Sequence, residues 1–134
     1  MRWSYYLYGE WDPKYQTHQG VDVQHPTSGK AVRNVMGTSA RKVEVIRAES
    51  GGSFDGCVIV WDDYLKETIV YLHIGTPTVT KNQMIKAGDQ IGTQSTQWKH
   101  THFQAQDGKT TSIQPATYNT LKTRIPYGFM TWYI

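Results

Sequence analysis

The sequence predicts an all-β fold made mostly of antiparallel sheets, and three features of the chain point to it. Helix formers such as Met are few, with four copies, whereas the chain holds 12 Gly, nine Tyr and five Trp, a mix that favours strands and turns. Apolar residues recur at a period of two in several short runs. Glycine-rich turns separate these runs, which is typical of sandwiches and barrels of antiparallel strands.

The first clear strand is predicted over residues 42–47, and the glycine pair at 51–52 ends it. Two further strands are predicted over residues 56–61 and 68–74, because both runs are rich in β-branched residues. The polar run between them, residues 62–67, is predicted as a solvated hairpin connection. Its acidic side chains are therefore expected at the surface and not as a catalytic acid pair; they are Asp62, Asp63 and Glu67.

In the second half of the chain, residues 86–92 are predicted as a turn that leads into another short strand. Residues 100–105 are predicted as a strand, and the Asp-Gly pair at 107–108 as the tight hairpin that closes it. Some of the connecting loops are expected to flank a cleft. The four candidates are residues 10–17, 48–56, 75–85 and 93–99.

Size, charge and cysteine content exclude several classes of protein. The chain has 134 residues, the size of one ordinary domain. Its net charge is +3 and its basic residues are scattered, so no nucleic-acid partner is expected. No apolar run reaches the roughly 18 residues of a transmembrane helix, so no membrane span is predicted. Cys57 is the only cysteine, which excludes an intrachain disulfide and a four-cysteine zinc site; it is expected to be buried and inert.

His18 and Asp22 are four residues apart on a stretch that does not suit a helix, since it contains Gly20. In a straight strand their Cα atoms would lie about 13 Å apart, too far for one zinc ion with bonds of about 2.0–2.2 Å. Gly20 permits a bend. Residues 18–22 are therefore predicted as a turn that brings the imidazole back toward the carboxylate.

His100 and His102 alternate along a predicted strand, so both imidazoles share one face while Thr101 points into the core. Either of them can bind a metal while the other stays free. His73 is expected to point into the same cleft. Together with the 18–22 turn, this set suits a catalytic zinc site with three protein ligands and an open position, rather than unrelated histidines.

The remaining histidine, His25, has no partner in these patterns and is expected to be structural or exposed. The HExxH motif is absent, which excludes a helical site of the thermolysin kind. No glutamate is placed to take a proton from water, so an imidazole must do so. The residues alone leave open which of the histidines does so.

The chain resembles the lysostaphin and LytM-type zinc endopeptidases. It carries their HxxxD, YxH and HxH motifs in order, at residues 18–22, 71–73 and 100–102. It also carries a KxGDxIG-like turn at residues 86–92 and a PxxY-like close at residues 115–118. The three motifs in this order are highly specific, whereas any one of them alone would not be.

The resemblance covers residues 8–118 and implies one catalytic peptidase domain over residues 1–134, with a C-terminal extension of unknown role at 119–134. It implies an antiparallel β fold with a narrow groove flanked by four loops. It further implies one Zn²⁺ per chain. The implied zinc ligands are His18, Asp22 and His102, and the implied catalytic imidazoles are His73 and His100.

The implied function is hydrolysis of stem-peptide or cross-bridge bonds in bacterial peptidoglycan, by a monomer that acts outside the cell or in the cell wall. Because the N-terminus lacks the apolar stretch of a secretory signal, the chain is expected to belong to a longer secreted or phage tail-associated protein. An inactive wall-binding or assembly scaffold of the same fold is the alternative, and a purely structural zinc module is a third. All five motif residues are present, which favours activity.

Three other side chains keep two interpretations each. Tyr71 either assists the oxyanion or packs in the sheet. Trp98 either walls a peptide groove or packs as an ordinary aromatic residue. Gln104 falls on the same side of its strand as His100 and His102, so it either touches substrate or orients a metal ligand.

Overall fold

The computed structural model describes residues 2–3, 11–12, 16–24, 30–115, 117–118 and 123. Every strand pairing among these residues is antiparallel, and none of them lies in a helix. The all-β prediction is therefore confirmed. No helix long and apolar enough to cross a membrane occurs in the described part of the chain.

Thirteen strands make up the described fold. They are β1 (Arg2–Trp3), β2 (Trp11–Asp12), β3 (Gln16–His18), β4 (Val21–Gln24), β5 (Ala31–Arg33), β6 (Val43–Glu49), β7 (Cys57–Asp62), β8 (Glu67–Leu72), β9 (Ile74–Pro77), β10 (Met84–Ile85), β11 (Gln90–Gln94), β12 (Thr101–Asp107) and β13 (Thr117–Tyr118). Among these, β6, β7 and β12 match predicted strands to within one or two residues at each end, and β11 is the short strand expected from the 86–92 turn.

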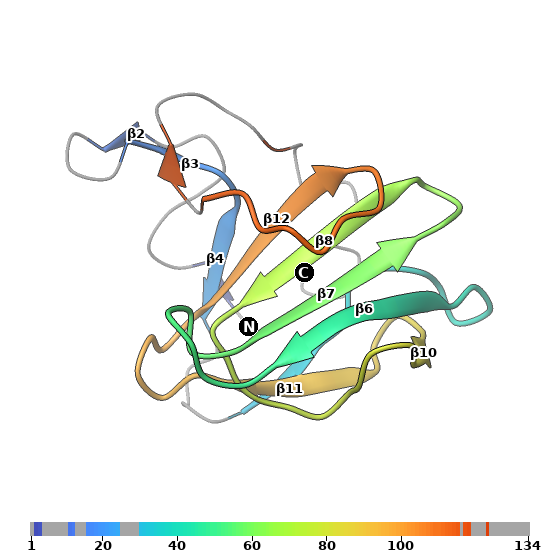
Figure 1. The fold of residues 1–134 in the computed structure, drawn as a ribbon. Coiled ribbons are helices and arrows are strands. Elements are labelled where there is room, and N and C mark those ends of the chain that lie inside the picture. Colours follow the sequence, from blue (N-terminus) through green and yellow to red (C-terminus); the bar gives the residue numbers. More distant parts are fainter. Residues whose placement is uncertain are drawn as a thin grey trace.

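The strands form three sheets. The largest has seven strands in the order β1-β4-β12-β8-β7-β6-β10, and its long central strands fill the middle of Figure 1. A three-stranded sheet, β5-β11-β9, lies behind it, and a second small sheet, β13-β3-β2, projects from the side that carries β4. The chain thus passes from the small sheet to the main sheet between β3 and β4.

Alternation along the central strands divides their side chains between an inner and an outer face. On the inner face, apolar residues of β4, β6, β7, β8 and β12 pack against Val32 of β5, Ile74 of β9 and Ile91 of β11. Phe103 and Tyr71 meet there edge to face, with ring centroids 5.1 Å apart. This core stiffens the strands that carry the histidines.

The outer face carries a second apolar cluster made of Ile46, Cys57, Ile59, Trp61, Val70 and Leu72. Phe54 and Ile113 pack against it from outside the strands. Cys57 is buried, as predicted, and burial raises the pKa of its thiol. The thiolate form is therefore disfavoured.

The hairpin predicted at Asp107-Gly108 is wrong in part. The chain does turn there, with Gly108 at φ +76°, but among the described residues no later strand pairs with β12. Residues 108–115 instead cross the outer face, as Figure 1 shows, and Ile113 packs on the apolar cluster. An Asp-Gly pair indicates a turn, whereas the partner of the next segment depends on long-range contacts.

The strand predicted over residues 68–74 is interrupted at His73. Its φ of +65° ends β8 at Leu72 and starts β9 at Ile74, which belongs to a different sheet. The His73 amide donates to the Gly56 carbonyl at 3.0 Å, and its own carbonyl accepts from the Ser95 amide at 3.0 Å. Neighbouring loops on both sides thus hold this switch between sheets.

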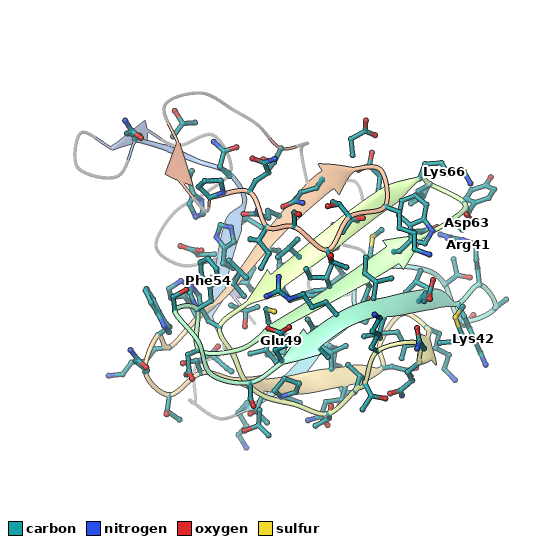
Figure 2. The ribbon with its side chains drawn as sticks, viewed as in Figure 1. Arg41, Lys42, Glu49, Phe54, Asp63 and Lys66 are labelled. Carbon is teal, nitrogen blue, oxygen red and sulfur yellow. The ribbon has the colours of Figure 1, made fainter. Side chains whose placement is uncertain are left out.

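The hairpin predicted between β7 and β8 is present, but two of its acidic residues are buried rather than solvated. Asp62 is fully buried, paired with Arg41, and Glu67 is also buried. Asp62 accepts hydrogen bonds from two amides of the turn that follows it, at 3.0 and 3.1 Å. Figure 2 shows the exposed Asp63–Lys66 pair and Arg41 at the end of the sheet far from Phe54. The contacts of Asp62 and Asp63 therefore stabilise the turn of the hairpin.

Candidate metal centre

His18, Asp22 and His102 come together where β3, β4 and β12 meet. His18 ends β3, the chain bends at Gln19 and Gly20, and β4 begins at Val21. The predicted bend is therefore present. The register of the β12–β4 pairing brings in the third residue, because it places His102 directly opposite Asp22.

Gly20 is needed here for a reason of space. A Cβ atom on this residue would lie 1.9 Å from the Phe103 carbonyl oxygen and 2.9 Å from His102 Nε2. Real Cβ atoms essentially never come within 3.0 Å of another heavy atom, so any larger residue must push β12 away. The glycine lets the bend pack directly on the strand that carries His102.

Substituting Gly20→Ala is expected to lower stability and weaken metal binding together. Forcing a methyl group into this contact should cost about 3 kcal/mol or more, a fall in Tm of about 10 °C. Gly51→Ala is the control, because its Cβ would meet nothing within 4 Å and only its positive φ should cost about 1–2 kcal/mol. Thermal unfolding and zinc titration measure both effects. Equal behaviour of the two variants would contradict this account of the bend.

The three side chains suit a tetrahedral zinc ion. Asp22 Oδ1 lies 3.1 Å from His102 Nδ1 and 3.4 Å from His18 Nε2, and the three ligand atoms all lie within 4.8 Å of one another. Zinc–nitrogen and zinc–oxygen bonds of about 2.0–2.1 Å place neighbouring ligands about 3.3 Å apart. Nitrogen and carboxylate oxygen are also the donor types that zinc takes.

Charge at this site is consistent with a cation. Asp22, His18 and His102 are all at least 96% buried. Burial alone would raise the pKa of Asp22, but hydrogen bonds with His102 and His18 outweigh it and hold that pKa well below its usual range. Asp22 is therefore a carboxylate at neutral pH, and a buried carboxylate calls for a positive partner.

His73 and His100 lie beside this cluster, with their ring centroids 4.9 Å apart. The Nδ1 atom of His73 donates to the Phe54 carbonyl at 2.6 Å, and that of His100 donates to the Trp98 carbonyl at 2.8 Å. Because a carbonyl only accepts, Nδ1 carries the proton in each ring. Each Nε2 is left as the basic nitrogen, and that of His100 lies 3.6 Å from Asp22 Oδ1.

Both imidazoles are neutral at neutral pH. Burial lowers the pKa of His73 to about 4, although its hydrogen bond to Phe54 acts in the opposite direction. Burial also lowers the pKa of His100, against the attraction of Asp22. A neutral imidazole whose Nδ1 carries the proton can accept another proton at Nε2.

Two of the predicted flanking loops, 48–56 and 93–99, meet beside these rings. Ser95 Oγ donates to Asp55 Oδ2 at 2.6 Å and accepts from the Trp98 amide at 3.0 Å. One contact therefore joins the loop whose carbonyl holds His73 to the loop whose carbonyl holds His100. The sequence did not single out Asp55 or Ser95, because loop-to-loop contacts leave no spacing signal.

Trp98 stacks on His73, with ring centroids 4.2 Å apart and an interplanar angle of 14°. It remains 40% exposed. Both interpretations of this residue therefore have support, since one ring face packs on His73 while part of the side chain meets solvent.

Loop 75–85 does not lie beside these rings as loops 48–56 and 93–99 do. Its Asn82 and Gln83 bond to Val45 in the middle of β6, away from the histidines.

Tyr71 does not reach the site. It is fully buried on the inner face, where its hydroxyl donates to Asn34 Oδ1 at 2.8 Å and accepts from the Val35 amide at 2.9 Å. The oxyanion interpretation is wrong, and the packing interpretation holds.

Gln104 is also fully buried, with Oε1 2.7 Å from His102 Nε2. It therefore contacts a candidate metal ligand.

Some predictions fall outside the described residues. His25, half of loop 10–17 and nearly all of the 119–134 extension belong to that part of the chain. The end of the PxxY-like close is described, and it forms β13, which pairs with β3 beside His18. This pairing anchors the strand that carries one candidate ligand.

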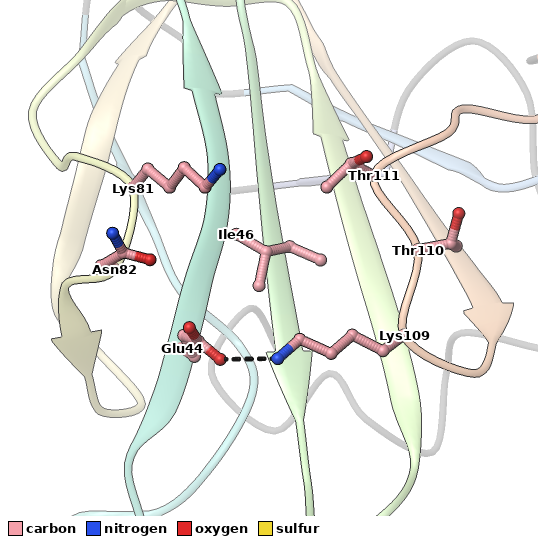
Figure 3. A pocket seen from close by; sticks show the side chains of 7 residues that line it. All are labelled: Glu44, Ile46, Lys81, Asn82, Lys109, Thr110 and Thr111. Carbon is pink, nitrogen blue, oxygen red and sulfur yellow. Dashed lines mark hydrogen bonds and ion pairs between the residues drawn. The ribbon is translucent and has the colours of Figure 1, made fainter.

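A cavity of about 380 Å³ lies against the outer face of β6. Figure 3 shows that it is lined mainly by polar side chains, with an ion pair between Lys109 and Glu44 at its edge. None of the histidines or Asp22 lines it. It is therefore separate from the metal centre.

Comparison with known proteins adds the family context. Residues 16–115 match the sequence profile of Peptidase family M23. No curated protein sequence is similar enough to count as a match.

Solved structures match the fold. The catalytic domain of the antimicrobial peptidase lysostaphin from Staphylococcus simulans matches with a TM-score of 0.72 at 20% identity, over 96% of this chain and 92% of that domain. LytU matches with a TM-score of 0.70 at 21% identity, over 93% and 81% of the two chains. A mutant catalytic domain of the prophage-encoded M23 protein EnpA from Enterococcus faecalis matches with a TM-score of 0.63 at 20% identity, over 87% and 90%.

Proposed function

The chain belongs to Peptidase family M23, and on that premise we propose that it is a zinc-dependent endopeptidase that hydrolyses peptide bonds of bacterial peptidoglycan. The observation that carries this proposal is the buried His18–Asp22–His102 cluster beside two neutral imidazoles. The wall substrate follows from the resemblance to lysostaphin-type endopeptidases. Such an enzyme acts outside the cell, on the wall.

His18, Asp22 and His102 are the proposed zinc ligands, one ion per chain. Two neutral imidazoles and one carboxylate leave the ion one net positive charge, and three protein ligands leave one position open. Zinc in such a site supplies a Lewis acid that lowers the pKa of water and polarises a carbonyl. The transfer of protons during hydrolysis is therefore left to the residues around the ion.

His73 and His100 are the proposed proton carriers. Hydrolysis of a peptide bond needs one proton taken from the attacking water and one given to the leaving amine. Each ring is anchored at Nδ1 by a backbone carbonyl, which presents Nε2 for this exchange. One imidazole acts as the base, and the other stabilises the oxyanion or protonates the amine.

Zinc analysis and wall clearing separate this enzyme from an inactive scaffold of the same fold. The purified protein should bind one zinc ion per chain and should clear a turbid suspension of bacterial walls. Removal of zinc by a chelator should stop the clearing, and added zinc should restore it. A protein that binds zinc and walls but never clears them would be the scaffold.

The bond cut is expected to be a muropeptide link flanked by Gly or Ala. The loop before β7 carries Gly51, Gly52 and Ser53, three small exposed residues, and Trp98 is partly exposed beside His73. Such a surround suits slim peptide segments better than bulky ones, and ordinary folded proteins should resist cleavage.

Digestion of walls with different cross-bridges, followed by sequencing of the released peptides, measures this preference. A folded globular protein incubated in parallel is the control. Cuts found only between two bulky residues would contradict the expected specificity while leaving the zinc centre untouched.

A further inference from the structure

Two buried glutamines follow His102 on the outer side of β12. Gln104 is fully buried, and Gln106 is 4% exposed. Gln104 Nε2 donates to Gln106 Oε1 at 2.8 Å and to the Gln114 carbonyl at 2.9 Å. Gln106 Nε2 donates to the Ser112 carbonyl at 2.9 Å, and its Oε1 accepts from the Gln114 amide at 3.0 Å. These bonds tie the 108–115 segment to β12.

Backbone groups decide which way each side-chain amide faces. The Gln114 amide can only donate, so it requires the oxygen of Gln106. The carbonyls of Ser112 and Gln114 can only accept, so they require the nitrogens of Gln106 and Gln104. Both orientations are therefore assigned by groups that cannot exchange roles.

This assignment also fixes the direction of the Gln104 side-chain oxygen, Oε1. Gln104 Oε1 has no freedom to turn away, and it faces His102 Nε2 at 2.7 Å. A carbonyl oxygen at this distance requires a proton on Nε2. With Nε2 engaged in this way, Nδ1 is the nitrogen left to bind an ion, and it lies 3.1 Å from Asp22 Oδ1.

The 108–115 segment is itself well anchored. Arg47 on β6 donates to the Thr111 carbonyl at 3.0 Å, and Lys109 pairs with Glu44 at 3.1 Å, as Figure 3 shows. Ile113 adds an apolar contact. The segment therefore provides a firm support for the glutamines.

We propose that Gln104 is a positioning residue for the metal centre: held by Gln106 and the 108–115 segment, it fixes the ring of His102 so that Nδ1 faces the ion. A hydrogen bond of this kind sets the tautomer of a ligating imidazole and increases its basicity. The role rests on the zinc site proposed above.

Zinc affinity of three variants tests this role. Gln104→Met fills similar space without an acceptor and should bind zinc about 10- to 100-fold more weakly. Gln104→Glu keeps an oxygen facing His102, and a proton on its second oxygen replaces the amide donor toward the Gln114 carbonyl. Its zinc affinity should stay within a few-fold of that of the parent protein. Gln106→Met is the matched control, since it breaks the same network two residues further along the strand from His102. It should lose thermal stability while its zinc affinity falls by less than that of Gln104→Met, because the Gln114 carbonyl still holds Gln104.

The outcomes separate the two claims. A parent protein that binds no zinc refutes the metal site itself. Unchanged affinity in Gln104→Met, or an equal loss in Gln104→Glu, refutes the role of Gln104 alone. If Gln104→Met does not fold, nitrogen NMR of the zinc-loaded parent protein decides. His102 should show Nδ1 bound to zinc and a slowly exchanging proton on Nε2, and zinc on Nε2 would overturn the proposal.

Discussion

Substituting Ala for His18, Asp22 or His102 is expected to reduce the zinc content from one ion per chain to nearly none. The three ligand atoms lie within 4.8 Å of one another in a buried site, and a two-ligand remnant does not satisfy the coordination of zinc. Hydrolysis should be lost with the metal. Metal analysis after dialysis, with circular dichroism to establish folding, measures both.

Asp22→Asn is the informative partner of Asp22→Ala. It preserves the shape of the side chain and one oxygen but removes the negative charge that the site holds at neutral pH. Zinc binding should therefore weaken strongly even though the geometry is kept. Full zinc retention in any one of the alanine variants would show that its residue is not a ligand.

Substituting Ala for His73 or His100 is expected to separate metal binding from catalysis. Neither residue belongs to the three-residue cluster, so the zinc content should stay at one ion per chain. The rate of wall hydrolysis should fall by about 10²–10⁴-fold, the usual contribution of a general acid or base. The loss should appear in kcat, because the three proposed zinc ligands remain, and zinc bound there would still polarise the substrate carbonyl.

A second variant controls for packing at this position. Trp98→Phe keeps an aromatic ring over His73 and leaves the backbone carbonyl that holds His100. It should retain most of the rate. Near-normal hydrolysis in His73→Ala or in His100→Ala would remove that histidine from the mechanism.

The candidate site was predictable where it depends on local spacing. The two-residue step from His100 to His102 places both side chains on one side of the chain, and the 18–22 turn bends at the glycine as expected. The reason for that glycine was not predictable. It lies in the carbonyl of Phe103, a residue far away along the chain, which leaves no room for a Cβ atom.

Features that depend on contacts between residues far apart in the chain could not be predicted from the sequence. The break at His73 follows from a change of sheet between β8 and β9, and the apolar run through Ile74 gives no sign of it. The carbonyls of Phe54 and Trp98 hold the two imidazoles, but every residue offers a carbonyl. Asp62 is buried because Arg41, from another part of the chain, pairs with it.

Chemical analysis of the ends created in digested walls tests the central claim most directly. Walls treated with the zinc-loaded protein in water enriched with heavy oxygen should release fragments that mass spectrometry resolves. Each cut should create one new amino group and one new carboxyl group that carries the heavy oxygen, and chelation should abolish both. New reducing sugar ends without new amino groups, or cutting that persists after zinc is removed, would contradict a zinc-dependent endopeptidase.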